Sequence, residues 1–461
     1  MLFSSNVFLF VFLPLVLISY YISPRWLRNP VLLLFSLLFY GWGEPVYLLL
    51  MIFVILMNYG FGLWIHQLRT NEIDARGILA LSVVCNLLLL GYYKYTGFLL
   101  HSLSGIFPAL ENIQLPEITL PIGISFYTFQ SMSYVIDVYR QDAPVQRNPL
   151  DFGTYVALFP QLIAGPIVRY RDVALQMVSR RENLSAFSSG ILLFIAGLAK
   201  KVLLANQMGS LWNLLRPEPG TFAAWVGIIA YSFQIYFDFS GYSDMARGLG
   251  RMFGFEFLEN FNYPYISQSI TDFWRRWHIS LSTWFREYVY IPLGGNRKGK
   301  VRNYVNLLTV WMLTGFWHGA SWNFLLWGLY YALLLILEKA FLLKLLNKLP
   351  AGLRLLYTLP LVILGWALFY FEDLGALGQF LGRMFTLAET SRTGLNLISA
   401  YLPLLIAAAI ASTPLCKGLV SQSMHKAPVR YGMLAAACAA LALCVAALAS
   451  QSYNPFIYFR F

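Results

Sequence analysis

The thirty-five residues between Arg302 and Glu338 include no Asp, Glu, Lys or Arg. One helix needs about 20 apolar residues to cross a bilayer, so this run is too long for a single span. Within lipid, a chain must satisfy its own backbone hydrogen bonds, which restricts such a run to helices. We therefore predict a hairpin of two tilted helices over residues 305–341, with its turn near Gly315 and Gly319.

The only side chain of this run that titrates near neutral pH is His318. An ionisable group at membrane depth is costly to bury, and it is a functional candidate by default. The predicted hairpin would hold the imidazole inside the protein, between two apolar halves. His318 is accordingly the first candidate for a catalytic residue.

The composition sets the class of protein. Hydrophobic residues make up 58% of the 461 residues, and charged residues only 12%. This leaves too little polar surface for a soluble fold and predicts an all-α polytopic integral membrane protein.

The net charge of +12 would suggest a nucleic-acid partner in a soluble protein. Here the basic residues fall in short segments between apolar runs, as expected of cytoplasmic loops next to membrane lipids. Nucleic acid is therefore not expected as a partner. The four cysteines show neither CxxC nor histidine spacing, so we predict no disulfide framework and no metal site.

Residues 152–168 form an apolar run that has arginines on both sides and contains Pro160, Gly165 and Pro166. Positive charge at both ends opposes a membrane crossing, and prolines interrupt helices. We predict a re-entrant segment here instead of a span.

The longest stretch without a convincing span is 241–304, and we expect the chemistry there. From Arg275 to Arg302 it has seven basic residues and one acid, so it should face the cytoplasm. Two interpretations stay open. One is an interfacial amphipathic helix with an aromatic belt of tryptophans. The other is a re-entrant mouth that binds a phosphate-bearing cytosolic donor. The candidate donor-binding residues are Arg275, Arg276, Trp277, Ser282, Arg286, Asn296 and Arg297.

His278 lies in the same stretch, beside Arg276. Neighbouring positive charge would keep its imidazole neutral, as a general base or hydrogen-bonding partner requires, although a purely structural histidine is the alternative. Asp238 and Asp244 close a long apolar run. Carboxylates at that depth need cationic partners, for which nearby arginines are the candidates, so we expect ion pairing before direct catalysis.

Several segments carry a resemblance to a known family. Through them the chain resembles the membrane-bound O-acyltransferases (MBOAT) of the bacterial alginate O-acetylation type. The segments are PIGISFYTFQSMSYVIDVYR (121–140), FPQLIAGPIVRY (159–170), FDFSGYSDMARGLGRMFGF (237–255), NFNYPYISQSITDFWRRWHISLSTWFREYVYIPLGGNRKG (260–299), LTGFWHGASWNFLLWGLYYA (313–332) and YNPFIYFRF (453–461).

The resemblance implies one transmembrane domain over residues 1–461, a ring of about 11–12 tilted helices with re-entrant segments around a central tunnel. In that family the histidine of the WHG segment is catalytic, which corresponds to His318. The polar position of RRWHISLS, His278, is the second signature residue. The supporting residues on these segments are Asp238, Asp244, Asp272, Trp317 and Asn323.

The implied reaction is acyl transfer to a hydroxyl, with His318 as general base and His278 positioning the donor or polarising its carbonyl. The resemblance suggests acetyl-CoA or another cytosolic acyl thioester as donor, with no metal and no bound cofactor. It implies a bacterial inner-membrane protein that works with an extracytoplasmic SGNH-type acetyltransferase or a small acceptor protein. The acceptor would be alginate or a similar exopolysaccharide, and peptidoglycan is the alternative polymer.

Two hypotheses come from another class of function. A secondary transporter would also place a histidine at membrane depth, but the chain shows no internal repeat. A non-catalytic scaffold of a polysaccharide export complex would not need His318 for acetylation.

Overall fold

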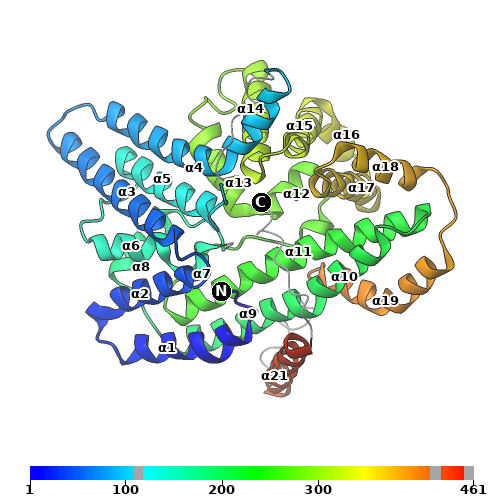
Figure 1. Cartoon of the computed structure of the whole chain (residues 1–461), viewed down its shortest axis with the longest axis horizontal. Helices are drawn as coiled ribbons and strands as arrows, with labels where there is room; N and C mark the ends of the chain where they lie inside the picture. Colours follow the sequence, from blue (N-terminus) through cyan, green and yellow to red (C-terminus); the bar gives the residue numbers. More distant parts are fainter. Residues whose placement is uncertain (108–117, 164, 416–426, 451–461) are drawn as a thin grey trace. The chain divides into compact units, whose positions relative to one another are not determined.

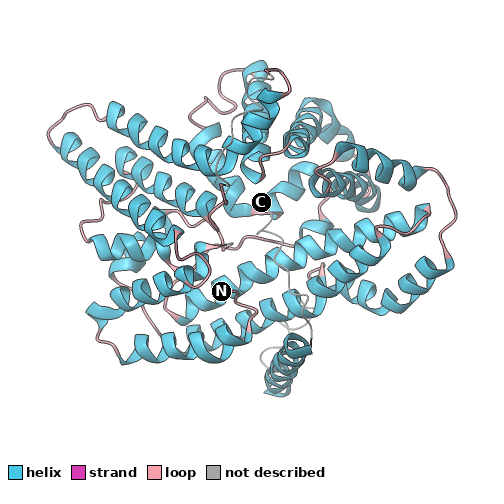
Figure 2. Cartoon of the chain, in the orientation of Figure 1, coloured by secondary structure: helices cyan, strands magenta, loops and turns pink. Residues whose placement is uncertain are grey.

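The computed structural model describes residues 1–107, 118–163, 165–415 and 427–450. Over these residues the chain folds into α-helices with short 3-10 and π-helical pieces, and it forms no β-strand (Figures 1 and 2). The all-α prediction is confirmed. The segment YNPFIYFRF, at 453–461, lies outside the described residues.

Seven helices of the described residues are long and apolar enough to cross a membrane, which confirms a polytopic membrane protein. The number is lower than the sequence predicted because several apolar runs form shorter helices, such as α2 (Arg28–Gly41) and α15 (Trp322–Leu337). The ring and its tunnel stay predictions. The seven helices are Tyr47–Thr70 (α3), Arg76–Ser104 (α4), Leu184–Leu215, Thr221–Met252 (α11), Ala351–Tyr370 (α17), Arg392–Ala411 (α19) and Pro428–Ser450, within α21 (Ala427–Ser450).

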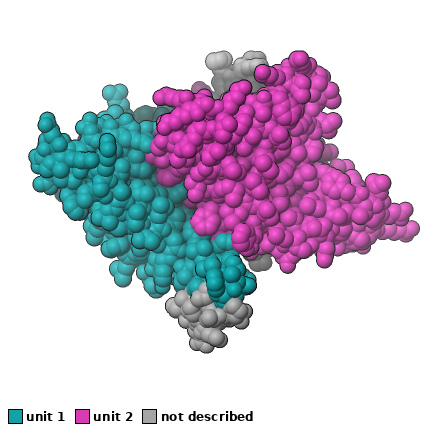
Figure 3. Space-filling view, turned by 90° about the horizontal axis from the view of Figure 1, so that it is seen from above, with its two compact units in different colours: residues 1–194, 245–258 teal, residues 195–244, 259–461 magenta. Residues whose placement is uncertain are grey.

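The chain packs as two compact units, which Figure 3 colours separately. Unit 1 consists of residues 1–194 and 245–258, and unit 2 of residues 195–244 and 259–461. The single domain that the resemblance implies stays a prediction.

Unit 1 is built around α5 (Ile124–Arg140), which packs against α3 and α4. The α3–α5 contact depends on Gly62, because a Cβ atom there would come within 2.4 Å of the Tyr134 ring. Besides α2 to α5, unit 1 contains η1 (Phe8–Phe12), α1 (Leu13–Ile22), η2 (Arg25–Leu27), α6 (Pro149–Ala157), α7 (Phe159–Leu162), α8 (Tyr170–Val178) and most of α9 (Leu184–Ala199).

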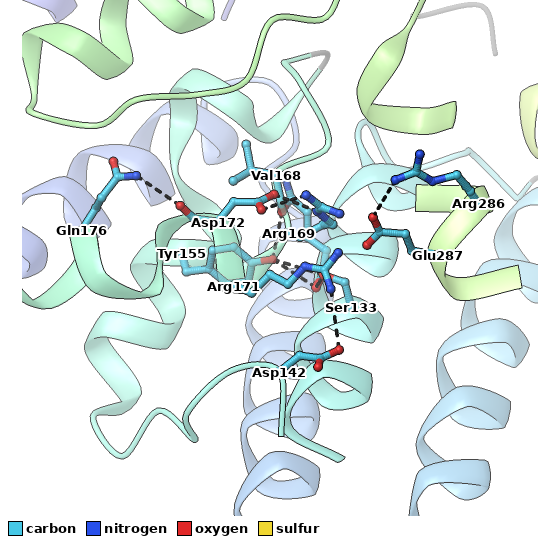
Figure 4. A network of polar contacts seen from close by, with 11 residues as sticks. Ser133, Asp142, Tyr155, Val168, Arg169, Arg171, Asp172, Gln176, Arg286 and Glu287 are labelled. Carbon is cyan, nitrogen blue, oxygen red and sulfur yellow. Dashed lines mark hydrogen bonds and ion pairs between the residues drawn. The ribbon is translucent and has the colours of Figure 1, made fainter. Parts of the chain in front are cut away.

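The predicted re-entrant segment 152–168 contains most of α6 and all of α7, helices of 9 and 4 residues that are too short to span. Its two ends are joined by Tyr155, whose hydroxyl donates to the Val168 carbonyl at 2.9 Å (Figure 4). Just beyond it, Arg169 donates two hydrogen bonds of 2.8 Å to the Asp172 carboxylate. These bonds hold the segment as a compact loop of unit 1.

Unit 2 contains the segments to which the sequence assigns chemistry. Its helix α14 (Lys300–His318) and α15 pack closely, and the three residues 319–321 join them. The remaining elements are η4 (Lys200–Ala205), α10 (Asn206–Leu215), most of α11, η5 (Pro264–Ile266), α12 (Ile270–Arg276), α13 (Ile279–Phe285), η6 (Arg286–Tyr290), η7 (Glu338–Leu342), α16 (Leu343–Leu346), α17, α18 (Leu374–Phe385), α19 and α21.

Candidate active site

His318 is the last residue of α14, and its side chain is 5% exposed. Its ring centroid lies 5.1 Å from that of Trp327 in α15 and 5.3 Å from that of Phe369 in α17. Three helices of unit 2 therefore surround the imidazole with aromatic rings. Such an enclosure excludes water, which strengthens any hydrogen bond or charge interaction that the imidazole makes.

Three glycines, in α14, in α15 and in the connection between them, allow the close packing that positions His318. A Cβ atom at Gly315 would lie 2.2 Å from the Phe324 carbonyl oxygen, and one at Gly319 would lie 2.1 Å from the Phe324 ring. On the other side of the contact, a Cβ atom at Gly328 would lie 2.4 Å from the Trp311 carbonyl oxygen. The two helices pack backbone to backbone at Gly315 and Gly328. The histidine is thereby fixed at the end of a tightly packed pair of helices.

His278 lies between α12 and α13, with φ 45° and ψ 55°. A left-handed backbone is uncommon for a residue other than glycine and stores strain. Asn260 helps to hold this turn: its backbone carbonyl accepts from the Ile279 N–H at 3.0 Å, and its side-chain oxygen accepts from the Ser280 N–H at 3.1 Å and hydroxyl at 2.9 Å. The sequence indicated His278 but not Asn260, which precedes it by eighteen residues.

The Asn260 side-chain oxygen also determines the proton position on His278, whose Nδ1 lies 3.2 Å from it. Since that oxygen already accepts from Ser280, the pair forms a hydrogen bond if Nδ1 carries the proton. Nε2 is then an acceptor. Burial lowers the pKa of His278 to about 3, so the ring is neutral at physiological pH. The cause is burial, not the neighbouring positive charge that the sequence suggested.

Trp317 lies between the two histidines. Its ring centroid is 4.9 Å from that of His318 and 6.3 Å from that of His278. The sequence separates the histidines by forty residues, and unit 2 brings both against one indole. Trp317, one of the predicted supporting residues, therefore contacts both candidate catalytic histidines.

The N-terminus of α12, the helix that precedes His278, is anchored by Glu338, a buried carboxylate. It accepts from the backbone N–H groups of Ile270 at 2.7 Å and Thr271 at 2.8 Å, and from the Thr271 hydroxyl at 2.6 Å. A carboxylate at a helix N-terminus satisfies N–H groups that lack a partner within the helix. Glu338 was not among the predicted site residues, and the available signal for it is that its charge ends the apolar run 303–337.

Asp272 also stabilises α12 from within. Its carboxylate accepts from the Arg276 Nε–H at 2.9 Å, and its backbone N–H donates to the hydroxyl of Ser269, the N-cap residue, at 3.0 Å. These are local contacts of a short helix, and they give Asp272 a structural function.

The predicted donor-binding residues fall in two settings. Trp277 is buried, with its ring centroid 4.7 Å from that of Trp366, and the Ser282 hydroxyl donates to the Trp274 carbonyl at 3.4 Å. The other group consists of the half-buried Arg276 and four exposed residues, of which Arg286 pairs with Glu287 at 3.2 Å (Figure 4). Donor binding by any of them stays a prediction. The four exposed residues are Arg275, Arg286, Asn296 and Arg297.

This stretch does not form the one continuous helix with an exposed aromatic belt that the interfacial alternative predicts. Two helices of seven residues each, α12 and α13, replace the continuous helix, and the turn at His278 separates them. The tryptophans of this region, Trp274, Trp277 and Trp284, are all buried. Their rings form the interior of unit 2 and do not face lipid.

The two acids of α11 have cationic partners. Asp238 lies 2.6 Å from Lys201 Nζ, and Asp244 lies 2.6 Å from Lys200 Nζ. Ion pairing was expected, but with arginines. Lysines of η4 fill this position because this element runs close beside α11: a Cβ atom at Gly241 would lie 3.1 Å from the backbone nitrogen of Lys201.

Polar atoms near His318 remain available for a ligand. Asn323 Nδ2 donates to the Leu368 and Phe369 carbonyls, both at 3.2 Å, but its buried Oδ1 has no hydrogen-bond partner among the described residues. The same holds for the buried indole N–H of Trp327. A buried polar group without a protein partner is a candidate contact for a ligand or an ordered water.

A cavity of about 850 Å³ lies in unit 1, and another of about 710 Å³ lies in unit 2 where α17 ends. The wall of the second includes Tyr370, which directly follows Phe369, the neighbour of His318. No local sequence pattern predicts this cavity, because its wall combines Arg216 with residues more than 150 positions later. Its polar and aromatic lining consists of Arg216, Tyr370, Phe371, Glu372, Asp373, Gln379 and Arg383.

No three His, Cys, Asp or Glu side chains come together as a potential metal site in the residues that the structure describes.

Comparison with known proteins agrees with the geometry. Residues 139–347 match the model of MBOAT, the membrane-bound O-acyltransferase family. The chain is 42% identical over 499 aligned residues to a protein of Azotobacter vinelandii named probable alginate O-acetylase AlgI, and 43% identical over 485 to one of the same name in Pseudomonas putida. Both alignments cover all of both chains. It is 36% identical over 412 residues to the peptidoglycan O-acetyltransferase of Helicobacter pylori, covering 81% of this chain and 78% of that one. The chain therefore belongs to the membrane-bound O-acyltransferase family and is a multi-pass membrane O-acyltransferase.

Proposed function

We propose that this protein, in the bacterial inner membrane, moves acetyl groups from a cytosolic thioester for the O-acetylation of an extracytoplasmic polysaccharide, alginate or a similar exopolysaccharide. The observation that carries the proposal is the buried His318 at the end of α14, among rings from α15 and α17. The full-length similarity to proteins named alginate O-acetylase supports the acceptor class.

His318 acts as the general base in this proposal. One imidazole nitrogen takes the proton of the acceptor hydroxyl as its oxygen attacks the thioester carbonyl carbon. The new C–O bond forms, the C–S bond breaks, and the departing thiolate takes the proton from the imidazolium. The donor is acetyl-CoA, and no redox partner is needed for the step to balance.

His278 positions the donor. Its Nε2 is an acceptor when Nδ1 donates to Asn260, so it suits an N–H group of the donor better than a thioester carbonyl. Of the two functions considered for this residue, positioning therefore fits the neutral, buried ring better than polarisation of the carbonyl.

The acceptor approaches through the cavity at the end of α17. A sugar-binding site typically combines aromatic faces with carboxylate, amide and guanidinium groups, and this cavity has Phe371, Glu372, Gln379 and Arg383. Along the chain its wall residue Tyr370 directly follows Phe369, which contacts His318. An acceptor hydroxyl could be delivered by the polymer itself, by a small acceptor protein or by an SGNH-type acetyltransferase.

The second candidate function is peptidoglycan O-acetylation by the same chemistry. The similarity to the Helicobacter pylori protein supports it. The identity to proteins named for alginate is higher and covers more of the chain, so it favours the exopolysaccharide.

The acetyl ester content of both polymers distinguishes these functions. In a strain that lacks the gene, we expect the exopolysaccharide to lose its acetyl esters and the peptidoglycan to keep them. Complementation with the wild-type gene should restore the esters. Loss from peptidoglycan alone would establish the second function, and unchanged esters in both would contradict both. Transfer of label from radioactive acetyl-CoA to membranes tests the donor.

A further inference from the structure

We propose that a basic cavity of unit 1 binds the phosphate of an anionic phospholipid, whose acyl chain lies along the adjoining apolar groove. The cavity measures about 850 Å³ and lies between the start of α2 and the chain that follows α8. It is independent of the acyl-transfer chemistry and consists only of unit 1 residues.

The lining of this cavity carries a net positive charge. Four arginines face two carboxylates, which leaves two positive charges more than negative ones. A concave site with this excess attracts anions, and guanidinium groups match the geometry of phosphate oxygens. The charged residues are Arg25, Arg28, Arg180, Arg181, Asp151 and Glu182.

Two of these arginines share one carboxylate. Glu182 lies 2.7 Å from Arg28 and 3.8 Å from Arg180, whose side chain is only 7% exposed. The Nε of Arg28 is buried and has no hydrogen-bond partner among the described residues. Arg180 also donates to the Tyr20 hydroxyl at 2.9 Å and to the Asn29 amide oxygen at 2.6 Å. Arg28 is therefore the cation whose buried Nε lacks an acceptor in the described part of the chain, and it favours a further anion. A lipid phosphate would supply that charge.

The other two arginines are available at the surface. Arg25 and Arg181 are exposed, and neither forms an ion pair with any residue that the structure describes. Their side chains can therefore turn toward a phosphate without breaking an existing contact.

The apolar groove favours a lipid over a soluble phosphate compound. It measures about 310 Å³, is lined by Tyr21, Leu184 and Phe187, and shares Glu182 and Asn183 with the basic cavity. Leu184 is 80% exposed there. An acyl chain in the groove would cover this apolar surface, which a soluble phosphate cannot do.

Exposed apolar side chains around the cavity place it at a membrane interface. Trp26 is 76% exposed and Val178 is 79% exposed, and both line it. Tryptophan at the headgroup level and arginine beside it are typical of the cytoplasmic leaflet, where anionic lipids and basic residues attract one another.

The test uses the full chain, purified in detergent and stripped of lipid. Native mass spectrometry measures binding of phosphatidylglycerol, of phosphatidylcholine with the same acyl chains, and of CoA. The first variant is Arg25→Ala with Arg181→Ala, which removes two exposed charges from the cavity. Its matched control is Lys344→Ala with Lys348→Ala, which removes two exposed charges of α16 and the residues after it. Leu184→Gln tests the groove.

We expect the wild type to bind phosphatidylglycerol in preference to phosphatidylcholine. The double arginine variant should bind it about tenfold more weakly or worse, and the lysine control should not change. Leu184→Gln should also weaken the binding of phosphatidylglycerol. Equal binding by the wild type and the arginine variant would overturn the proposal. Arginine-dependent binding of CoA without phosphatidylglycerol binding would also overturn it, because the cavity would then serve the soluble donor.

Discussion

Lys201 and Asp238 form an ion pair inside unit 2, with Nζ 2.6 Å from Oδ1 and side chains that are 3% and 2% exposed. Removal of one partner leaves the other charge buried. We expect Lys201→Met to lower the free energy of unfolding by about 3–5 kcal/mol.

The double variant Lys201→Met with Asp238→Leu removes both charges and should recover most of the lost stability. The thermal unfolding midpoint in detergent measures both effects. A single variant as stable as the wild type would show that this pair does not stabilise the helices.

The pH dependence of stability should include His278. Burial lowers its pKa from the ordinary 6.5 to about 3, so the unfolded chain binds a proton between these values and the folded chain does not. This contribution to stability is present above pH 6.5 and is lost as the pH falls toward 3. The slope reaches at most about 1.4 kcal/mol per pH unit.

His278→Asn isolates this contribution because asparagine tolerates a positive φ. Unfolding midpoints between pH 8 and 5 should fall more steeply for the wild type than for this variant. Parallel curves would contradict a buried neutral imidazole.

Glu338 should act as a positioning residue through α12. Glu338→Ala removes the acceptor of the buried Ile270 N–H, at about 1–3 kcal/mol, and of the half-buried Thr271 N–H and hydroxyl, at less for each. We expect a lower unfolding midpoint and slower acetyl transfer. Asp74→Asn, at an exposed carboxylate, serves as the control. An unchanged midpoint for Glu338→Ala would show that α12 does not depend on this anchor.

The α14–α15 contact should not tolerate a methyl group at Gly315. Gly315→Ala would place Cβ 2.2 Å from the Phe324 carbonyl oxygen, so the helices must separate and His318 must shift. We expect reduced acetylation at reduced stability. Gly352→Ala is the matched control, since no atom lies within 4 Å of its Cβ position. Full activity of Gly315→Ala would argue against a closely packed hairpin.

Composition and charge spacing were sufficient to predict an all-α membrane protein, because these properties do not depend on which helices meet. The uncharged run between Arg302 and Glu338 likewise indicated that the His318 side chain is buried inside the protein. Both predictions rest on local sequence.

The contacts between distant segments could not be predicted. Lys201 precedes Asp238 by thirty-seven residues, and no periodicity reveals that η4 lies beside α11. Arginine was expected as the partner because arginines are nearer in sequence. The burial of Trp277 was missed for a related reason: a tryptophan among arginines has the same local pattern at a lipid interface and inside a protein.

The central claim is that His318 carries out acyl transfer, and acetyl ester content tests it most directly. A deletion strain would be complemented with wild type, His318→Ala or His101→Ala, which alters an exposed histidine at the end of α4. Membrane levels of each protein would be matched. We predict that His318→Ala lowers the rate of ester formation by about 10²–10⁴-fold, while His101→Ala acts as wild type. Full acetylation by His318→Ala at normal abundance would contradict the account.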